Sequence, residues 1–202
     1  MNSGIAAALG AAFLFGASTP IAKRLIGDIP PVVLAGLFYA GSGAGLAIVD
    51  VLRRRSSTSR ADADTVSQIA ATDWPWLAGA IMLGGIAAPL LLMFGLASTS
   101  ASSASLLLNL EGVLTAAIAW FVFRENVDVR IAIGMILIVA GGIVLAFEPG
   151  ATSGISTGAL LVAAACACWA IDNNLTRRIS ASDAVRIAAI KGGVAGAVNL
   201  AI

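Results

Sequence analysis

The chain has 202 residues, of which 59% are hydrophobic and 11% are charged. Soluble domains carry roughly 25% charged residues, so the composition excludes that class and indicates a membrane protein. The 12 basic and 11 acidic residues almost cancel, and they leave no basic face for nucleic acid. The sequence contains no His, the commonest general base and metal ligand, and we expect no metal or other cofactor.

The chain divides into about seven apolar stretches, most of them near the roughly 20 residues that a membrane-spanning helix requires. They cover about residues 4–26, 31–52, 73–97, 102–123, 129–147, 158–172 and 184–202, and the sixth is shorter than usual. Asp73 is expected to cap the third span, with Trp74 and Trp76 at the lipid headgroups. The short turn 98–101 predicts a tight antiparallel hairpin of the third and fourth spans. The predicted fold class is therefore an all-α, polytopic transmembrane helix bundle.

Residues 53–73 form the one long polar stretch of the sequence, and we interpret them as a solvated loop. Asp62 and Asp64 within it could suggest the metal-diphosphate site of a sugar transferase. An isolated pair in a polar loop is more typical of solvated surface charge, which is the interpretation we adopt.

Several residues are expected to weaken the helices at membrane depth. Pro20 lies inside the first span, where it should kink the helix or free a backbone carbonyl. Ser18 and Thr19 could satisfy that carbonyl or present their hydroxyls to a substrate. Glycines and Pro89 loosen the middle of the third span, and the glycines between 41 and 45 allow another helix to approach the second span closely.

The basic residues predict the orientation of the chain. If the N-terminus is cytoplasmic, the outer loops hold only Lys23 and Arg24, and the inner loops hold about nine basic residues. The inner set is Arg53, Arg54, Arg55, Arg60, Arg124, Arg130, Arg177, Arg178 and Arg186. Positive charge gathers on the cytoplasmic side of membrane proteins, so a cytoplasmic N-terminus in the cell inner membrane is expected.

The two ends of the chain are similar to each other. A shift of about 154 residues places Gly4 on Gly158, the basic pair 23–24 on the pair 177–178, and residues 46–48 on 200–202. This predicts a complete five-helix repeat at 1–147, an outer linker at 148–157 and the start of a second repeat at 158–202. Five spans are an odd number, so the copies would be inverted, as in many secondary transporters. We expect the sequence to be a fragment rather than a natural short form that assembles with another chain.

Several motifs identify a family resemblance. They are Phe15-Gly16-Ala17-Ser18 followed by Lys23, the segments 97–102 and 106–111 leading to Glu111, Arg124-Glu125, and the glycines from 134 to 142. This pattern resembles the EamA-like branch of the drug/metabolite transporter superfamily. The resemblance implies a ten-helix inner-membrane carrier of amino acids, other metabolites or drugs, with two inverted five-helix copies around a central cavity. Many members carry a proline in the fourth span where this chain has Gly112.

Glu111 is the most informative candidate residue. It lies about nine residues into the fourth span, near the membrane midplane, where an ionised side chain costs about 2.5 kcal/mol or more. A structural partner on another helix and a substrate-cation or proton site are both consistent with that position, and the second is favoured. Lys191 lies at similar depth in the seventh span, since each residue rises about 1.5 Å. We therefore expect a Glu111 to Lys191 ion pair that opens during transport.

The other candidates have weaker signals. Asn109 should project away from Glu111 to a neighbouring helix, where it packs by hydrogen bonding or contributes to the cavity. Trp169 could stack on a substrate ring or fill the cavity wall. Residues 172–174 are expected at the cytoplasmic end of the sixth span as a cap or gate. Lys23 is expected at the outer surface, with its ammonium extended to the interface.

Two functions from different classes are compatible with these residues. The first is a secondary carrier, an exporter or exchanger of a small metabolite, amino acid or drug that works by alternating access in the lipid bilayer, with a homodimer as one expected assembly. The second is a membrane-embedded enzyme, or its accessory subunit, acting on a lipid-linked substrate. The absence of His, of a nucleophile motif and of a second buried carboxylate in the apolar spans argues against an enzyme. The sequence does not identify the substrate.

Overall fold

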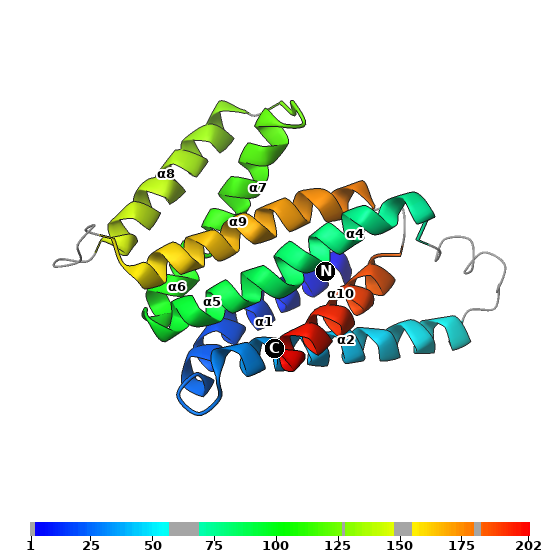
Figure 1. The fold of residues 1–202 in the computed structure, drawn as a ribbon. Helices are drawn as coiled ribbons and strands as arrows, with labels where there is room; N and C mark the ends of the chain where they lie inside the picture. Colours follow the sequence, from blue (N-terminus) through cyan, green and yellow to red (C-terminus); the bar gives the residue numbers. More distant parts are fainter. Residues whose placement is uncertain (1–2, 57–68, 127, 148–154, 180–182) are drawn as a thin grey trace.

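The protein is described by a computed structural model covering residues 3–56, 69–126, 128–147, 155–179 and 183–202. The described residues form seven helical stretches that are long and apolar enough to cross a membrane (Figure 1). The elements are α1 (Ser3–Leu25), α2 (Pro31–Ser56), η1 (Ala71–Asp73), α4 (Trp74–Ala80), η2 (Ile81–Ala87), α5 (Ala88–Ala97), α6 (Ala101–Leu107), α7 (Leu110–Phe121), α8 (Val129–Ala146), α9 (Thr157–Arg178) and α10 (Ala184–Ala201). The predicted all-α, polytopic membrane fold is confirmed. Asp62, Asp64 and residues 148–154 of the expected outer linker lie outside the described residues.

The sixth span is longer than predicted. Helix α9 runs from Thr157 to Arg178, so it does not end at Asp172. The prediction was wrong because three consecutive polar residues were taken as the end of an apolar helix. Asp172 and Asn174 are instead buried, and their polar atoms find partners within the protein.

The third and fourth spans are both irregular near their middles. In the third span, η2 is a π-helix, and the amide of Ala88 bonds to Leu83 O, five residues back. Pro89 follows directly and has no amide to donate, so backbone carbonyls of η2 need other donors. The fourth span is interrupted between α6 and α7 at residues 108–109. By contrast, α1 continues through Pro20 as one helix.

The packing differs from a simple hairpin of the third and fourth spans. Ser100 caps α6 by accepting a hydrogen bond from the amide of Ser103 at 3.0 Å, as a short turn requires. Helices α5 and α7 nevertheless pack chiefly on α9 rather than on each other. Asp73 precedes α4 without a side-chain capping bond. Figure 1 shows α9 running alongside α4–α5, and α7 meets α9 at an angle.

Helices α2 and α10 form the most extensive helix pair of the bundle. Gly43 meets Gly192 and Gly193 so closely that a methyl group on Gly43 would lie 2.2 Å from the Gly193 nitrogen. A methyl group on Gly41 or Gly45 would meet nothing within 4 Å. The predicted close approach is therefore confirmed at one of the three glycines, because a helix presents only one face to its neighbour.

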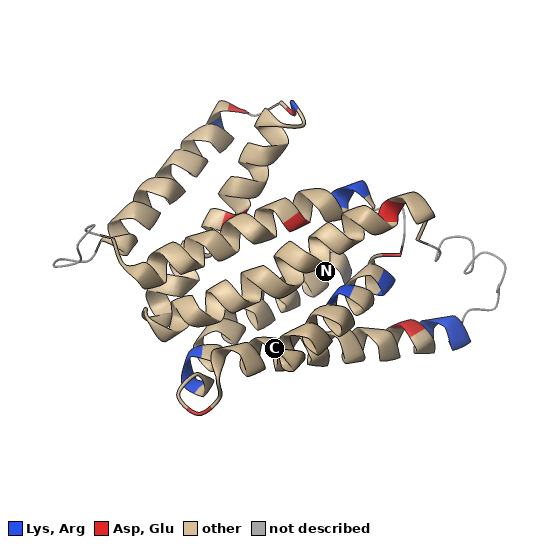
Figure 2. Ribbon diagram, viewed as in Figure 1, with Lys and Arg blue, Asp and Glu red and all other residues tan. Residues whose placement is uncertain are grey.

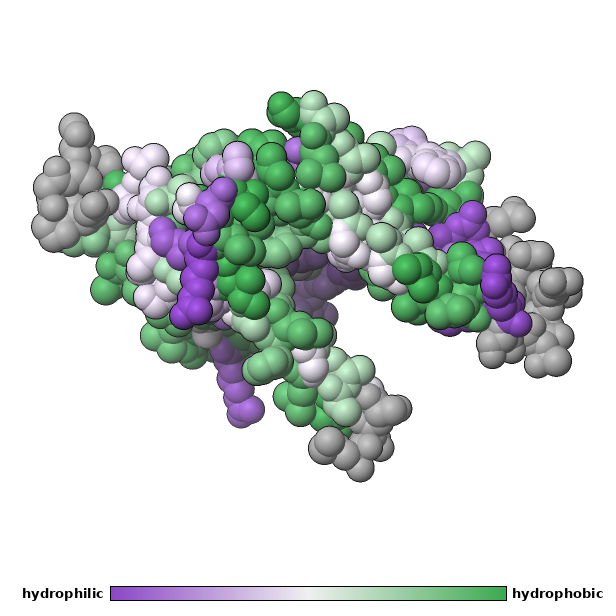
Figure 3. Space-filling view, turned by 90° about the horizontal axis from the view of Figure 1, so that it is seen from below, coloured by the Kyte–Doolittle hydropathy of each residue, from purple (hydrophilic) through white to green (hydrophobic). Residues whose placement is uncertain are grey.

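The outside of the bundle is apolar, as a membrane protein requires. Helix α8 exposes many of its large side chains, including Ile136, Leu137 and Val144. Figure 3 shows a mainly hydrophobic face with most of the strongly hydrophilic residues towards two ends. In Figure 2 most basic residues lie at the helix ends on one side of the bundle, and Lys23 and Arg24 close α1 on the other side.

Lys23 is half-buried, and its ammonium is anchored to the end of α5. Its Nζ lies 2.5 Å from Leu96 O and 3.5 Å from Ala97 O, the last carbonyls of α5. These carbonyls have no partner within their own helix, and a cation there also offsets the negative end of the helix dipole. The ammonium therefore lies where the ends of α1 and α5 meet, and its place at the outer interface stays a prediction.

Candidate functional site

A cavity of about 560 Å³ lies between α1, α2, α5, α7 and α9. Its wall contains four of the six predicted site residues, Ser18, Thr19, Glu111 and Trp169, although they come from three helices. The rest of the lining is mostly apolar, including Phe15, Phe38, Leu92 and Met93. An apolar cavity with a few polar groups is the usual form of a small-molecule site. Asn109 and Lys191 do not line this cavity.

Glu111 lies in the first turn of α7, directly after the interruption of the fourth span. Its Oε1 accepts a hydrogen bond from Asn173 Nδ2 at 2.9 Å, and the same amide is 3.3 Å from Thr115 Oγ1. The carboxylate stands at the N-terminal end of a helix, where the dipole stabilises negative charge. No basic side chain pairs with Glu111 among the residues that the structure describes. The arrangement can hold a carboxylate at the cavity wall without an ion pair.

The interruption before Glu111 is stabilised by side chains. Asn109 is exposed, and its Nδ2 donates to Leu106 O at 2.9 Å, within its own span. The thiol of Cys166 lies 3.7 Å from Leu107 O and 3.9 Å from Leu108 O. Asn109 therefore does not reach a neighbouring helix as predicted. It helps to satisfy carbonyls that the break leaves without regular helical donors.

Trp169 fixes the irregular third span against α2 and α9. Its indole Nε1 donates to Gly84 O at 2.9 Å, and Tyr39 donates to the same carbonyl at 2.6 Å. Asn199 Nδ2 donates to Gly85 O at 3.1 Å. A residue with an amide at position 89 would donate to Gly84 O in a π-helix or to Gly85 O in an α-helix. Pro89 has no amide, so these side chains supply the donors. We call Tyr39, Trp169 and Gly84 the aromatic junction. Trp169 thus both lines the cavity and holds the backbone beside it.

Ser18 and Thr19 occupy the α1 side of the cavity. Ser18 Oγ donates to Phe15 O at 2.6 Å, so its hydroxyl is used by the backbone of its own helix. Thr19 is buried. Pro20 frees the carbonyl of Gly16, whereas Ser18 bonds the preceding carbonyl, that of Phe15. Ser18 and Thr19 both line the cavity.

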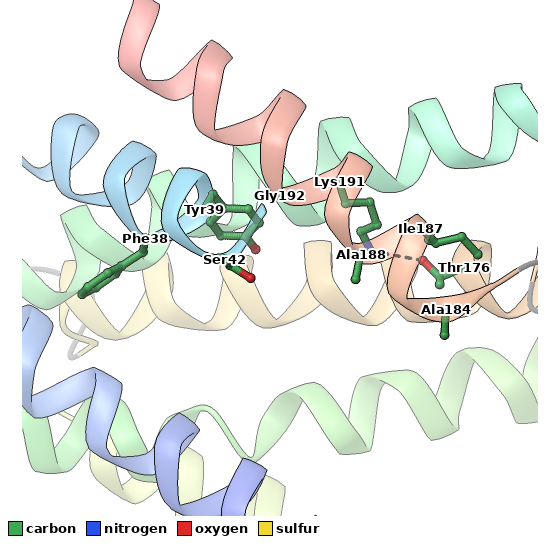
Figure 4. Close-up of a pocket in the computed structure, with 9 residues that line it drawn as sticks. All are labelled: Phe38, Tyr39, Ser42, Thr176, Ala184, Ile187, Ala188, Lys191 and Gly192. Atoms are coloured by element: carbon green, nitrogen blue, oxygen red, sulfur yellow. Dashed lines mark hydrogen bonds between the residues drawn. The ribbon is translucent and has the colours of Figure 1, made fainter. Parts of the chain in front are cut away.

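Lys191 pairs with Asp172 and not with Glu111. Its Nζ lies 2.5 Å from Oδ1 and 2.8 Å from Oδ2 of Asp172. Thr176 joins both groups, since its hydroxyl donates to Asp172 Oδ1 at 2.9 Å and accepts from Lys191 at 3.2 Å (Figure 4). The expected Glu111 to Lys191 pair is therefore corrected. Asp172 was missed as a partner because the helix was thought to end there.

A second cavity of about 420 Å³ lies between α2, α9 and α10 on the Lys191 side. Figure 4 shows Lys191 and Thr176 at one end of it and Phe38, Tyr39 and Ser42 at the other. The last three residues line both cavities, so the two spaces are separated by one side of α2. The tyrosine of the aromatic junction is part of this dividing wall.

Asp172 and Tyr39 had signals that could have been used. Asp172 and Thr176 are four residues apart and therefore share a helix face, and Lys191 is one of only two lysines in the chain. A lysine in an apolar span is a signal for a buried carboxylate partner. Tyr39 is the one tyrosine of the sequence and lies in the middle of an apolar span, where its hydroxyl needs a partner.

The seven spans define a multi-pass helical membrane protein with cavities between its helices. The model of the EamA-like transporter family matches residues 2–147, and the chain belongs to that family. This confirms the resemblance drawn from the sequence motifs.

The chain is also similar to an uncharacterized transporter of Methanothermobacter thermautotrophicus, with 28% identity over 200 residues. The match covers 95% of this chain and 58% of the relative, so the chain spans less than two thirds of the relative's length. No solved structure matches this chain.

Proposed function

We propose that this protein is a secondary transporter that moves a small metabolite, amino acid or drug across the cell inner membrane by alternating access. The observation that carries the proposal is the cavity of about 560 Å³ with Glu111 and Trp169 in its wall. Family membership supports a transporter rather than an enzyme. The sequence contains no His for the acid-base chemistry of the alternative enzyme.

Glu111 is proposed as the group that binds a cationic part of the substrate or a proton. Its partner is the neutral amide of Asn173, so a cation entering the cavity need not displace a protein ammonium. A carboxylate among apolar side chains interacts strongly with a cation because little water screens the charges. Trp169 would contact the apolar or aromatic part of the same substrate.

The orientation and the repeat complete the proposal. We place the N-terminus in the cytoplasm because, among the described residues, the helix ends on that side hold Arg53, Arg124 and Arg177, and those on the other hold only Lys23 and Arg24. Residues 1–147 and 158–202 would belong to two inverted copies that move against each other around the cavity, with export or exchange as the direction. The proposed scheme includes a homodimer as the assembly.

Transport by the protein, expressed from its whole reading frame and reconstituted in liposomes, tests the proposal. A panel of radiolabelled amino acids and organic cations would be tested with and without a pH gradient. Glu111→Gln should lower transport by about tenfold or more, which corresponds to at least about 1.4 kcal/mol of lost stabilisation. Asp28→Asn is the matched control, because Asp28 is an exposed carboxylate in the link between α1 and α2.

The pattern of loss separates the two roles of Glu111. If it carries a proton, the Gln variant loses uptake driven by the pH gradient and keeps exchange between equal pH compartments. If it binds the substrate, both are lost. Wild-type transport rates in the Gln variant would count against the proposed site. No transport of any tested compound by the wild type would count against the proposed function.

A further inference from the structure

A small basic pocket lies away from both cavities, where the end of α9 meets α4 and the chain after α7. It has a volume of about 190 Å³ and is lined by Phe123, Asn174, Arg177 and Arg178. The two arginines are the last residues of α9, and the phenylalanine follows α7 by two residues. None of these residues lines the two larger cavities. The transport site therefore does not explain this pocket.

Aromatic rings hold the two guanidinium groups at the pocket. The Arg178 Cζ lies 4.6 Å from the ring centroid of Trp76 and 5.8 Å from that of Phe123. The Arg177 Cζ lies 6.0 Å from the Phe123 ring. A ring covers the flat face of a guanidinium and leaves the N–H groups at its edge available for an acceptor.

The pocket carries uncompensated positive charge. Arg177 forms an ion pair with Glu125. The guanidinium of Arg178 has no carboxylate or other acceptor among the residues that the structure describes. A pocket with one paired and one unpaired arginine attracts an anion, and planar guanidinium groups match the geometry of phosphate oxygens.

The surroundings of the pocket are those of a membrane interface. Trp76 lies near the start of the third span, where a tryptophan is expected to meet lipid headgroups. Phe121 and Val122 directly precede the pocket residue Phe123 in the chain and are 72% and 68% exposed, so the end of α7 presents apolar side chains near the pocket. A ligand that combines a phosphate with a hydrocarbon chain would meet both features.

We propose that this pocket binds the headgroup phosphate of an anionic phospholipid, with an acyl chain along the exposed end of α7. Basic pockets between membrane helices, on the side where positive charge gathers, are typical sites for anionic headgroups. The unpaired charge of Arg178 selects a lipid with net negative charge over a zwitterionic one. This inference does not depend on the proposed transport function.

The test measures lipid binding to the purified protein, expressed from its whole reading frame. The protein is stripped of lipid in detergent and titrated with dioleoylphosphatidylglycerol or dioleoylphosphatidylcholine, and bound lipid is counted by native mass spectrometry. Arg178→Gln should weaken binding of the first lipid roughly fivefold, and Arg178→Lys should weaken it less because the charge remains. Arg130→Gln is the matched control, since Arg130 is an exposed arginine at the start of α8.

Each outcome decides the matter. Preferential binding of the anionic lipid, lost in Arg178→Gln and kept in Arg130→Gln, supports the proposal. Equal binding of both lipids, an unchanged Arg178→Gln variant, or equal losses in both Gln variants would overturn it. Inorganic phosphate added at millimolar concentration should not displace the lipid, and displacement would indicate a site for a soluble phosphate instead. Folding of Arg178→Gln is checked by gel filtration. If that variant does not fold, lipid binding is compared between the wild type and Arg178→Lys.

Discussion

Replacement of Lys191 by Met should destabilise the protein strongly, because it leaves Asp172 charged and buried. The two side chains make contacts of 2.5 and 2.8 Å, and the attraction at 2.8 Å is about 6 kcal/mol for an effective dielectric constant of about 20. Desolvation offsets much of this attraction while both partners are present. Removal of one partner leaves the desolvation cost without the attraction, and the expected loss is about 3–5 kcal/mol.

The exposure of the two side chains predicts an asymmetry between the single variants. The side chain of Asp172 is 7% exposed and that of Lys191 is 17% exposed and borders the second cavity. Asp172→Asn should therefore cost less than Lys191→Met, since the ammonium left behind can reach the cavity. The double variant removes both charges and should be more stable than Lys191→Met alone.

Unfolding in mixed micelles of sodium dodecyl sulfate and dodecylmaltoside measures these differences. Arg24→Met is the control, because Arg24 is exposed at the end of α1 and should change the free energy of unfolding by less than about 0.5 kcal/mol. A loss of less than about 1 kcal/mol in the free energy of unfolding of Lys191→Met would contradict an uncompensated buried charge at Asp172. A double variant that loses as much free energy of unfolding as the two single variants together would contradict the ion pair as well.

Two further substitutions test the packing. Gly43→Ala should push α2 and α10 apart at the Gly193 backbone and lower the free energy of unfolding by about 1–3 kcal/mol. Gly41→Ala places its methyl group in open space and should be near neutral. Equal effects of the two substitutions would contradict the assigned helix face. Lys23→Met should lose about 1–2 kcal/mol by leaving the Leu96 carbonyl without its donor, and faster hydrogen exchange at the end of α5 would accompany the loss. Unchanged exchange there would argue against the capping role.

The sequence was sufficient to predict the seven spans, apart from the length of the sixth, and much of the first cavity. The spans were predictable because the thickness of the bilayer sets how many apolar residues a crossing helix needs. That number does not depend on how the helices pack. Glu111 was identifiable because an ionisable group in an apolar span is costly, so it signals a partner or a site. The loosening of the third span followed from Pro89, since a missing amide is a local property of one residue.

The partners of these groups depended on the tertiary structure. Hydropathy predicts the depth of Lys191 in the membrane, but depth leaves open which of several helices it faces. Only the packing of α9 and α10 on η2 brought Asp172 to Lys191 and left Glu111 to Asn173. The sequence by itself therefore determined the fold class, the spans and the candidate carboxylate. The ion pair, the aromatic junction and the two cavities were decided by the tertiary structure, because each joins helices whose rotation and neighbours result from the packing of the whole bundle.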